Sequence, residues 1–168
     1  SRGLGDVYKR QCLDRILMTL RSIKSSEEIR RIEASQAITD AAFTHILPYI
    51  REGVTEREIA LEIEIFMRRQ GADAVAFELI VVSGQNSSLP HGVPGSKPIE
   101  KGDFVTMDTG ALLDGYHSDM TRTVALGQIT DEQKAVYDTV LKAHLAVIDT
   151  LKPGVKCCDM DKLARALI

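Results

Sequence analysis

The sequence lacks several features that would point to common classes of protein. It has three cysteines among 168 residues, and two of them, Cys157 and Cys158, are adjacent. No Cys-x-x-Cys pair is present, so neither a disulfide framework nor a thiolate zinc site is indicated, and a reducing, cytoplasmic location is favoured. The Gly-x-Ser-x-Gly elbow of serine hydrolases and the phosphate-binding P-loop are also missing, which argues against those two chemistries.

An excess of basic charge and a long apolar run are also lacking. The formal net charge is -3 and the isoelectric point is near 5.8, which argues against a nucleic-acid partner. The longest apolar run, residues 74–82, is interrupted by Glu78 and is too short to cross a bilayer. The first residues have no apolar signal-peptide core, so we also expect no membrane partner. With 44% hydrophobic residues, the chain can bury the core of one domain.

Three parts of the chain are distinguished by their composition. Residues 1–11 resemble the conceptual translation of a sequencing adapter, so we expect them to be an artefact. Residues 12–25 are rich in Arg and Lys and are expected to be a linker or the end of a missing N-terminal domain. Residues 26–168 then form the domain, and we expect native sequence to be missing at either end.

The order of elements in the domain predicts an α+β fold. Capping boxes predict three helix starts, and these are Ser25 with Glu28, Thr55 with Glu58, and Thr130 with Gln133. The first helix is expected to bury a stripe that includes Ile29 and Ile46, and the second is expected to end at Gly71. A strand is predicted over 77–82, and a last helix near Asp159. Antiparallel hairpins, not βαβ units, follow from this order.

The stretch 105–124 predicts a hairpin around Asp114-Gly115, two residues that tolerate the positive φ angles of a type I′ turn. The paired positions are then Leu113 with Tyr116, Asp108 with Thr121, and Gly110 with Asp119. Asp108 and Asp119 would lie on one face as diagonal neighbours, about 7–8 Å apart between Cα atoms. A loop longer by one residue would put them on opposite faces instead.

Two carboxylates on one face repel each other unless a cation or a proton lies between them. Asp is also disfavoured in strands, so metal ligation by Asp108 and Asp119 competes evenly with roles in turns or surface ion pairs. His91 lies between Pro90 and Gly92 and can exchange a proton or hydrogen bond near such a site; the alternative is an ordinary loop histidine. We expect His117 to face away from the carboxylates.

Two segments carry a resemblance to a known family. SGQNSSLPHGVPG, at 83–95, and GDFVTMDTGALLDGYHSDMTRTVALG, at 102–127, closely resemble the M24-type pita-bread metallopeptidases. The LPHG-P and SDMTRT forms are similar to the branch of Xaa-Pro aminopeptidases (aminopeptidase P) and Xaa-Pro dipeptidases (prolidases). The resemblance implies that residues 26–168 are the N-terminal half of the catalytic domain, with helices on an antiparallel sheet.

The resemblance also implies a site and a reaction. Asp108 and Asp119 would be the first ligands of two divalent metal ions, with Mn favoured and Co or Zn able to substitute, and His91 would be the catalytic histidine. The implied function is a metal-dependent exopeptidase that cleaves peptides before a proline at the second position, and the intact protein is compatible with a homodimer.

This sequence departs from the family pattern after Asp119, where nothing matches the remaining histidine and two glutamate ligands. We therefore expect the 168-residue chain itself to be inactive. The alternatives are a methionine aminopeptidase-like enzyme and a non-catalytic pita-bread binding module; the joint presence of His91, Asp108 and Asp119 argues against the second.

Overall fold

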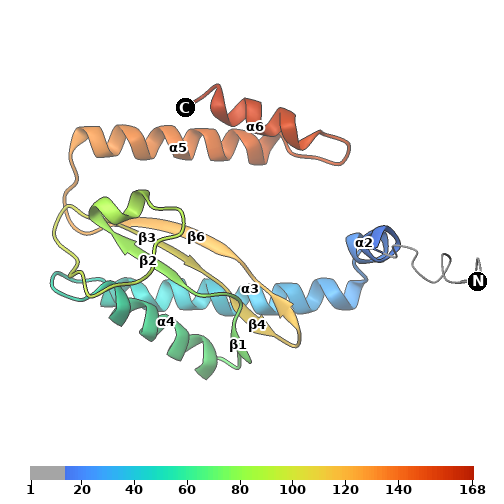
Figure 1. Cartoon of the computed structure of the whole chain (residues 1–168), viewed down its shortest axis with the longest axis horizontal. Helices are drawn as coiled ribbons and strands as arrows, with labels where there is room; N and C mark the ends of the chain where they lie inside the picture. Colours follow the sequence, from blue (N-terminus) through green and yellow to red (C-terminus); the bar gives the residue numbers. More distant parts are fainter. Residues whose placement is uncertain (1–13) are drawn as a thin grey trace, which may run out of the picture.

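The computed structural model describes residues 14–168, and Figure 1 shows their arrangement. The predictions for residues 1–11 therefore lie outside the described residues. The helices are α2 (Asp14–Ser22), α3 (Ser26–Ile46), η1 (Leu47–Tyr49), α4 (Glu56–Arg69), η2 (Gly84–Ser88), α5 (Asp131–Thr150) and α6 (Cys157–Arg165). The strands are β1 (Ala74–Val75), β2 (Ile80–Ser83), β3 (Phe104–Thr109), β4 (Ala111–Leu113), β5 (Tyr116–His117) and β6 (Met120–Ala125).

The strands form two small antiparallel sheets, so the predicted α+β class is confirmed. The larger sheet has the order β2-β3-β6 and the smaller one has the order β1-β4-β5. One long hairpin runs through both of them, because β3 continues into β4 and β5 continues into β6. The predicted strand over 77–82 is shorter than expected, since the segment before Ile80 is irregular and β1 lies apart from β2.

All three predicted capping boxes are formed. The side chains of Ser25, Thr55 and Thr130 each accept a hydrogen bond from the backbone N–H three residues on, and the side chain of that later residue accepts one from the backbone N–H of the capping residue. These bonds satisfy N–H groups that the first turn of a helix leaves free. Gly71 follows α4 with a φ of 101°, as expected for a helix stop that needs the left-handed region.

The core lies between the two sheets and the pair α3 and α4, because α3 packs on β4 and β5 and α4 packs on β1 and β2. Helix α3 contributes Ile38, Ala42 and Ile46, α4 contributes Ile59, Ile63 and Met67, and the sheets contribute Val81, Val105, Met107 and Ala111. The predicted apolar stripe on α3 is partly wrong, because Ile29 is exposed. The reason is that α3 extends beyond the end of the sheet at its N-terminal turns (Figure 1).

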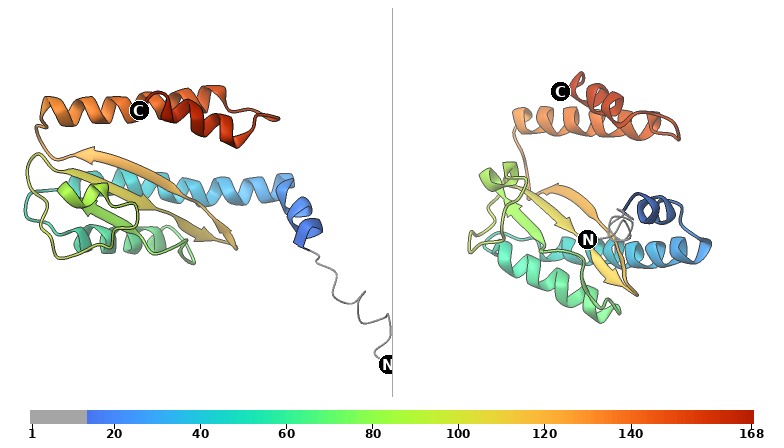
Figure 2. Two further views of the ribbon diagram at one scale, coloured as in Figure 1. Left: turned by 45° about the horizontal axis from the view of Figure 1, so that its top comes forward. Right: turned by 45° about the vertical axis from the view of Figure 1, so that its right-hand side comes forward.

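Helices α5 and α6 form a separate layer on the other side of the larger sheet (Figures 1 and 2). The start of α5 is held to the sheet by a ring contact between Phe104 and Tyr137, with centroids 5.9 Å apart. Gln133 also donates a hydrogen bond to the Gly102 carbonyl at 2.9 Å. Among residues 14–168, no helix is long and apolar enough to cross a membrane.

Candidate metal centre

The turn of the long hairpin sets the register of the two aspartates. Asp114 and Gly115 have φ angles of 51° and 79°, the positive values that a type I′ turn requires. Leu113 pairs with Tyr116, and Asp108 pairs with Thr121. The predicted register is therefore confirmed over both sheets.

Asp119 differs from the prediction in one respect: it does not lie within a strand. The ladder stops after Thr109 and Met120 and resumes with the bond from the Ser118 N–H to the Ala111 carbonyl, at 2.9 Å. The ladder is interrupted where the two arms of the hairpin approach each other closely: a Cβ atom on Gly110 would lie 2.1 Å from the Ser118 carbonyl oxygen. Only glycine fits there without a shift of the backbone.

The Ser118 side chain is the centre of a buried polar cluster that the sequence did not reveal. Its hydroxyl lies 2.7 Å from Thr39 Oγ1, 3.1 Å from Ser35 Oγ and 2.9 Å from the Ala111 N–H. All three hydroxyl-bearing residues are buried. Buried polar groups that satisfy one another fix a local geometry. The cluster therefore ties the chain next to Asp119 to helix α3.

The two carboxyl groups of the hairpin interact with each other. Partial burial raises the pKa of Asp119, and the negative charge and the carboxyl group of Asp108 raise it further. The Thr121 hydroxyl donates a hydrogen bond to Asp108 Oδ1 at 2.9 Å. A like-charged pair of this kind favours a proton or a cation between its members.

His91 lies on the same side of the sheet as Asp108. A Cβ atom on Gly92 would lie 2.5 Å from Val82 Cγ1, so the chain at Gly92 rests directly on Val82. Val82 and Ile80 are two residues apart on β2, and Ile80 pairs with Asp108. Alternation along a strand puts these three side chains on one face. The segment after β2 therefore folds over the face that carries Asp108.

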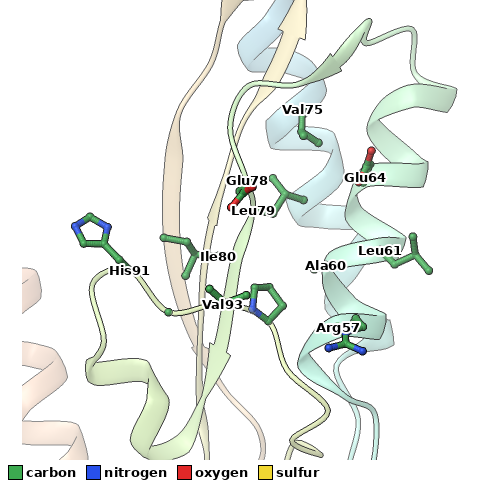
Figure 3. Close-up of a pocket in the computed structure, with 12 residues that line it drawn as sticks. Arg57, Ala60, Leu61, Glu64, Val75, Glu78, Leu79, Ile80, His91 and Val93 are labelled. Carbon is green, nitrogen blue, oxygen red and sulfur yellow. The ribbon is translucent and has the colours of Figure 1, made fainter.

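A cavity of about 660 Å³ lies beside this segment, at the edge of the larger sheet that β2 forms. Arg57 and Leu61 of α4 line one wall, and Ile80, His91 and Val93 line the other. Figure 3 shows His91 and Ile80 on the side of β2 that faces away from α4. The imidazole of His91 is exposed, so it is free to contact a bound molecule.

The expectation for His117 is wrong. His117, Asp119 and Thr121 are exposed, whereas Ser118 and Met120 between them are buried, so His117 shares the exposed side with Asp119. Its Nδ1 atom lies 3.1 Å from the Ala76 carbonyl oxygen. Side chains two positions apart along a strand point to the same face, so the shared side of residues 117 and 119 could have been predicted from the sequence alone.

The donors present suit a divalent cation only in part. Carboxylate oxygens are the ligands that hard divalent ions prefer. Within residues 14–168, no group of three or more His, Cys, Asp or Glu side chains is close enough to hold a metal ion. Asp108 and Asp119 can thus supply two carboxylate ligands, and further ligands would have to come from elsewhere.

The fold and the site place the chain in the broad class of α+β domains that carry, on the exposed side of an antiparallel sheet, a carboxylate pair able to bind a cation. The comparisons with known proteins narrow this class. The model of metallopeptidase family M24 matches residues 30–168. The chain belongs to metallopeptidase family M24, and its fold is that of the first half of the pita-bread domain.

Named relatives agree with this assignment. The chain is 49% identical over 146 residues to the uncharacterized peptidase YqhT of Bacillus subtilis. That match covers 87% of this chain and 41% of YqhT. It is 41% identical over 156 residues to the Xaa-Pro dipeptidase of Pyrococcus horikoshii. That match covers 93% of this chain and 44% of the dipeptidase. The chain thus spans less than half the length of these relatives.

Two solved structures show the same fold. The Xaa-Pro dipeptidase from Bacillus anthracis superposes with a TM-score of 0.87 at 48% identity, over 89% of this chain and 42% of that one. The prolidase from Pyrococcus furiosus gives a TM-score of 0.91 at 38% identity, over 100% of this chain and 52% of that one. The match to the Pyrococcus furiosus prolidase covers the whole chain, so it includes the hairpin and the segment that carries His91.

Proposed function

We propose that the whole protein is an Xaa-Pro peptidase, which hydrolyses the bond between an N-terminal residue and a following proline. The observation that carries the proposal is the pair of interacting carboxylates, Asp108 and Asp119, on the exposed side of an M24 fold. Relatives named as Xaa-Pro dipeptidase and prolidase support a substrate with proline at the second position.

The proposed metal ligands in this chain are Asp108 and Asp119. Two divalent ions, Mn by preference and Co or Zn as substitutes, would polarise the scissile carbonyl as Lewis acids when bound. Thr121 orients the Asp108 carboxylate through its 2.9 Å hydrogen bond, and Ser118 holds the backbone beside Asp119. These contacts would fix the direction of the two carboxylates before a metal arrives.

His91 is the proposed catalytic histidine. It lies on the Asp108 side of the sheet and its imidazole is exposed, so it can donate a hydrogen bond to a substrate oxygen or move a proton there. The nearby cavity, with Arg57 and Val93 in its walls, offers both charge and apolar surface.

The exposed thiols of Cys157 and Cys158 suit a reducing, cytoplasmic location.

A chimera tests the proposal. Residues 30–168 replace the matching segment of the Xaa-Pro dipeptidase of Pyrococcus horikoshii, and hydrolysis of an Xaa-Pro dipeptide is measured with added Mn²⁺. The chimera should be active. Asp108→Asn and Asp119→Asn should each lower kcat/KM by more than about 100-fold, which corresponds to about 2.7 kcal/mol of transition-state stabilisation. The 168-residue chain alone should show no hydrolysis.

Asp114→Asn is the matched control, because it makes the same change at the turn of the same hairpin, where Asn also tolerates a positive φ. It should leave kcat/KM unchanged. Cleavage of methionine-initiated peptides without proline would point to a methionine aminopeptidase-like enzyme. Peptide binding without hydrolysis, unaffected by Asp108→Asn, would point to a binding module.

A further inference from the structure

Glu56 is a buried carboxylate that no part of the proposed reaction uses. It is the first residue of α4 and only 1% of its surface is exposed. A fully buried carboxylate is rare in proteins and persists only where its charge is compensated and its oxygens are hydrogen-bonded. Its partners therefore indicate what it does.

The partners of Glu56 lie at both ends of one loop. Oε1 accepts hydrogen bonds from the Ser83 N–H at 2.7 Å, from the Ser83 hydroxyl at 3.0 Å and from Asn86 Nδ2 at 3.4 Å. Oε2 accepts one from the Gly95 N–H at 3.0 Å. Ser83 ends β2, and Gly95 closes the segment that carries His91. One side chain thus joins the two ends of residues 84–95.

The negative charge of Glu56 is balanced locally. The N-terminal end of α4 carries the positive end of the helix dipole, which favours an anion at this position. Lys97 donates a hydrogen bond to Ser83 Oγ at 3.0 Å and pairs with Asp103 at 2.7 Å. The ammonium group therefore lies one hydroxyl away from Glu56. These contacts satisfy the oxygens of the buried carboxyl group and place positive potential near it.

The loop that Glu56 closes leads directly to the candidate metal centre. Gly92 rests on Val82, and this contact directs the loop across the face that carries Ile80 and Asp108. The helix side of β2 holds Ser83 and Glu56, whereas the opposite side holds His91. The clamp and the histidine thus act on opposite sides of the same strand end, joined by a short loop.

We propose that Glu56 is a positioning residue, which fixes the loop 84–95 so that His91 is held next to the metal-binding carboxylates. The proposal rests on the catalytic role proposed for His91. It concerns the reaction indirectly, because Glu56 acts through the loop and does not contact the substrate.

Amide hydrogen exchange on the 168-residue chain tests the clamp itself. Glu56→Gln keeps the size of the side chain but replaces one acceptor oxygen with a donor that faces an N–H group. Exchange at the Gly95 N–H should become at least about tenfold faster in Glu56→Gln, and faster still in Glu56→Ala. Glu58→Gln is the matched control: it makes the same change in the same helical turn, keeps an acceptor oxygen for the Thr55 N–H, and alters no contact to the loop. Equal acceleration in Glu58→Gln, or no acceleration in Glu56→Gln, would overturn the clamp.

A double-mutant cycle in the chimera tests the link to His91. Glu56→Gln should lower kcat by about tenfold with little change in KM when His91 is present, and should have no further effect in the His91→Ala background. A residue that only stabilises the fold would lower the activity equally in both backgrounds, and that result would overturn the proposal. If the unmodified chimera fails to cleave Xaa-Pro dipeptides, the proposed function fails, and the exchange experiment still decides whether Glu56 orders the loop.

Discussion

Helices α3 and α5 are built alike but are used differently in this chain. They have 21 and 20 residues, and each begins with a capping box. Helix α3 buries five side chains against the sheet, whereas α5 buries only Ala143. Most large apolar side chains of α5 are exposed, and they include Val136, Val140, Leu141, Leu145 and Ile148. The start of a helix is therefore determined by residues near it in the sequence, whereas the burial of its apolar side depends on which other elements pack against it.

The largest effect is expected from a pair of identical truncations, one on α4, which buries an apolar face against the sheets as α3 does, and one on α5. Ile63 is 2% exposed on α4, and Ile148 is 55% exposed on α5. Ile63→Ala should lower the free energy of unfolding by about 3 kcal/mol, because it leaves a cavity between α4 and the sheet. Ile148→Ala should change it by less than about 0.5 kcal/mol. Denaturant unfolding of both variants measures the difference.

A large effect of Ile148→Ala would contradict the contrast between the two helices, because it would mean that the exposed face of α5 is covered in solution. Repeating the unfolding at several protein concentrations would then show whether a second copy of the chain covers it, since such stabilisation depends on concentration.

The difference between features that nearby residues determine and features that depend on distant residues also explains what could be predicted from the sequence. The capping boxes and the Asp114-Gly115 turn depend on residues at most four positions apart, and all of them were predicted correctly. The register of the hairpin followed from the turn. The burial of Glu56 could not be predicted, because its partners Ser83 and Gly95 lie 27 and 39 residues away.

The candidate site shows the same limit. The shared side of Asp108 and Thr121 followed from strand alternation and is confirmed by their pairing and hydrogen bond. The break in the ladder at Asp119 was missed, because it arises from the approach of Gly110 to the Ser118 carbonyl and from the hydroxyl cluster on α3. The assignment of both aspartates as metal ligands stays a prediction.

A second pair of variants compares a buried hydroxyl group that contacts α3 with an exposed hydroxyl group on α5. Ser118→Ala removes the centre of the buried cluster and leaves Thr39 and Ser35 without one partner. It should cost about 1–3 kcal/mol of unfolding free energy, which is the range for a buried polar group that loses its partner. Thr150→Ala removes an exposed hydroxyl at the end of α5 that donates a hydrogen bond to the Ala146 carbonyl, and should cost less than about 0.5 kcal/mol. Thermal or denaturant unfolding checks both. Equal costs would show that the cluster does not hold the hairpin to α3.

The smallest expected effect concerns the charge on the hairpin. The pKa of Asp119 is raised in the fold by partial burial and by Asp108, so its neutral form is favoured. A raised carboxyl pKa contributes stability below the unfolded pKa, and this contribution is lost as the pH rises through the folded pKa. Asp119→Asn should therefore stabilise the chain slightly at neutral pH, by less than about 0.5 kcal/mol because the side chain is largely exposed, and should have no such effect in acid.

Asp138→Asn on α5 is the opposing control, because Asp138 forms an exposed ion pair with Lys134. Its removal should destabilise the chain slightly at neutral pH, opposite in sign to Asp119→Asn. Unfolding curves measured across the carboxyl titration range, with and without millimolar Mn²⁺, separate the two cases. Mn²⁺ should stabilise the unmodified chain and the Asp138→Asn variant more than Asp119→Asn, because a cation relieves the repulsion between Asp108 and Asp119 and stabilises the state that binds it. A Mn²⁺ response that is the same in all three chains would mean that the hairpin carboxylates do not hold the ion.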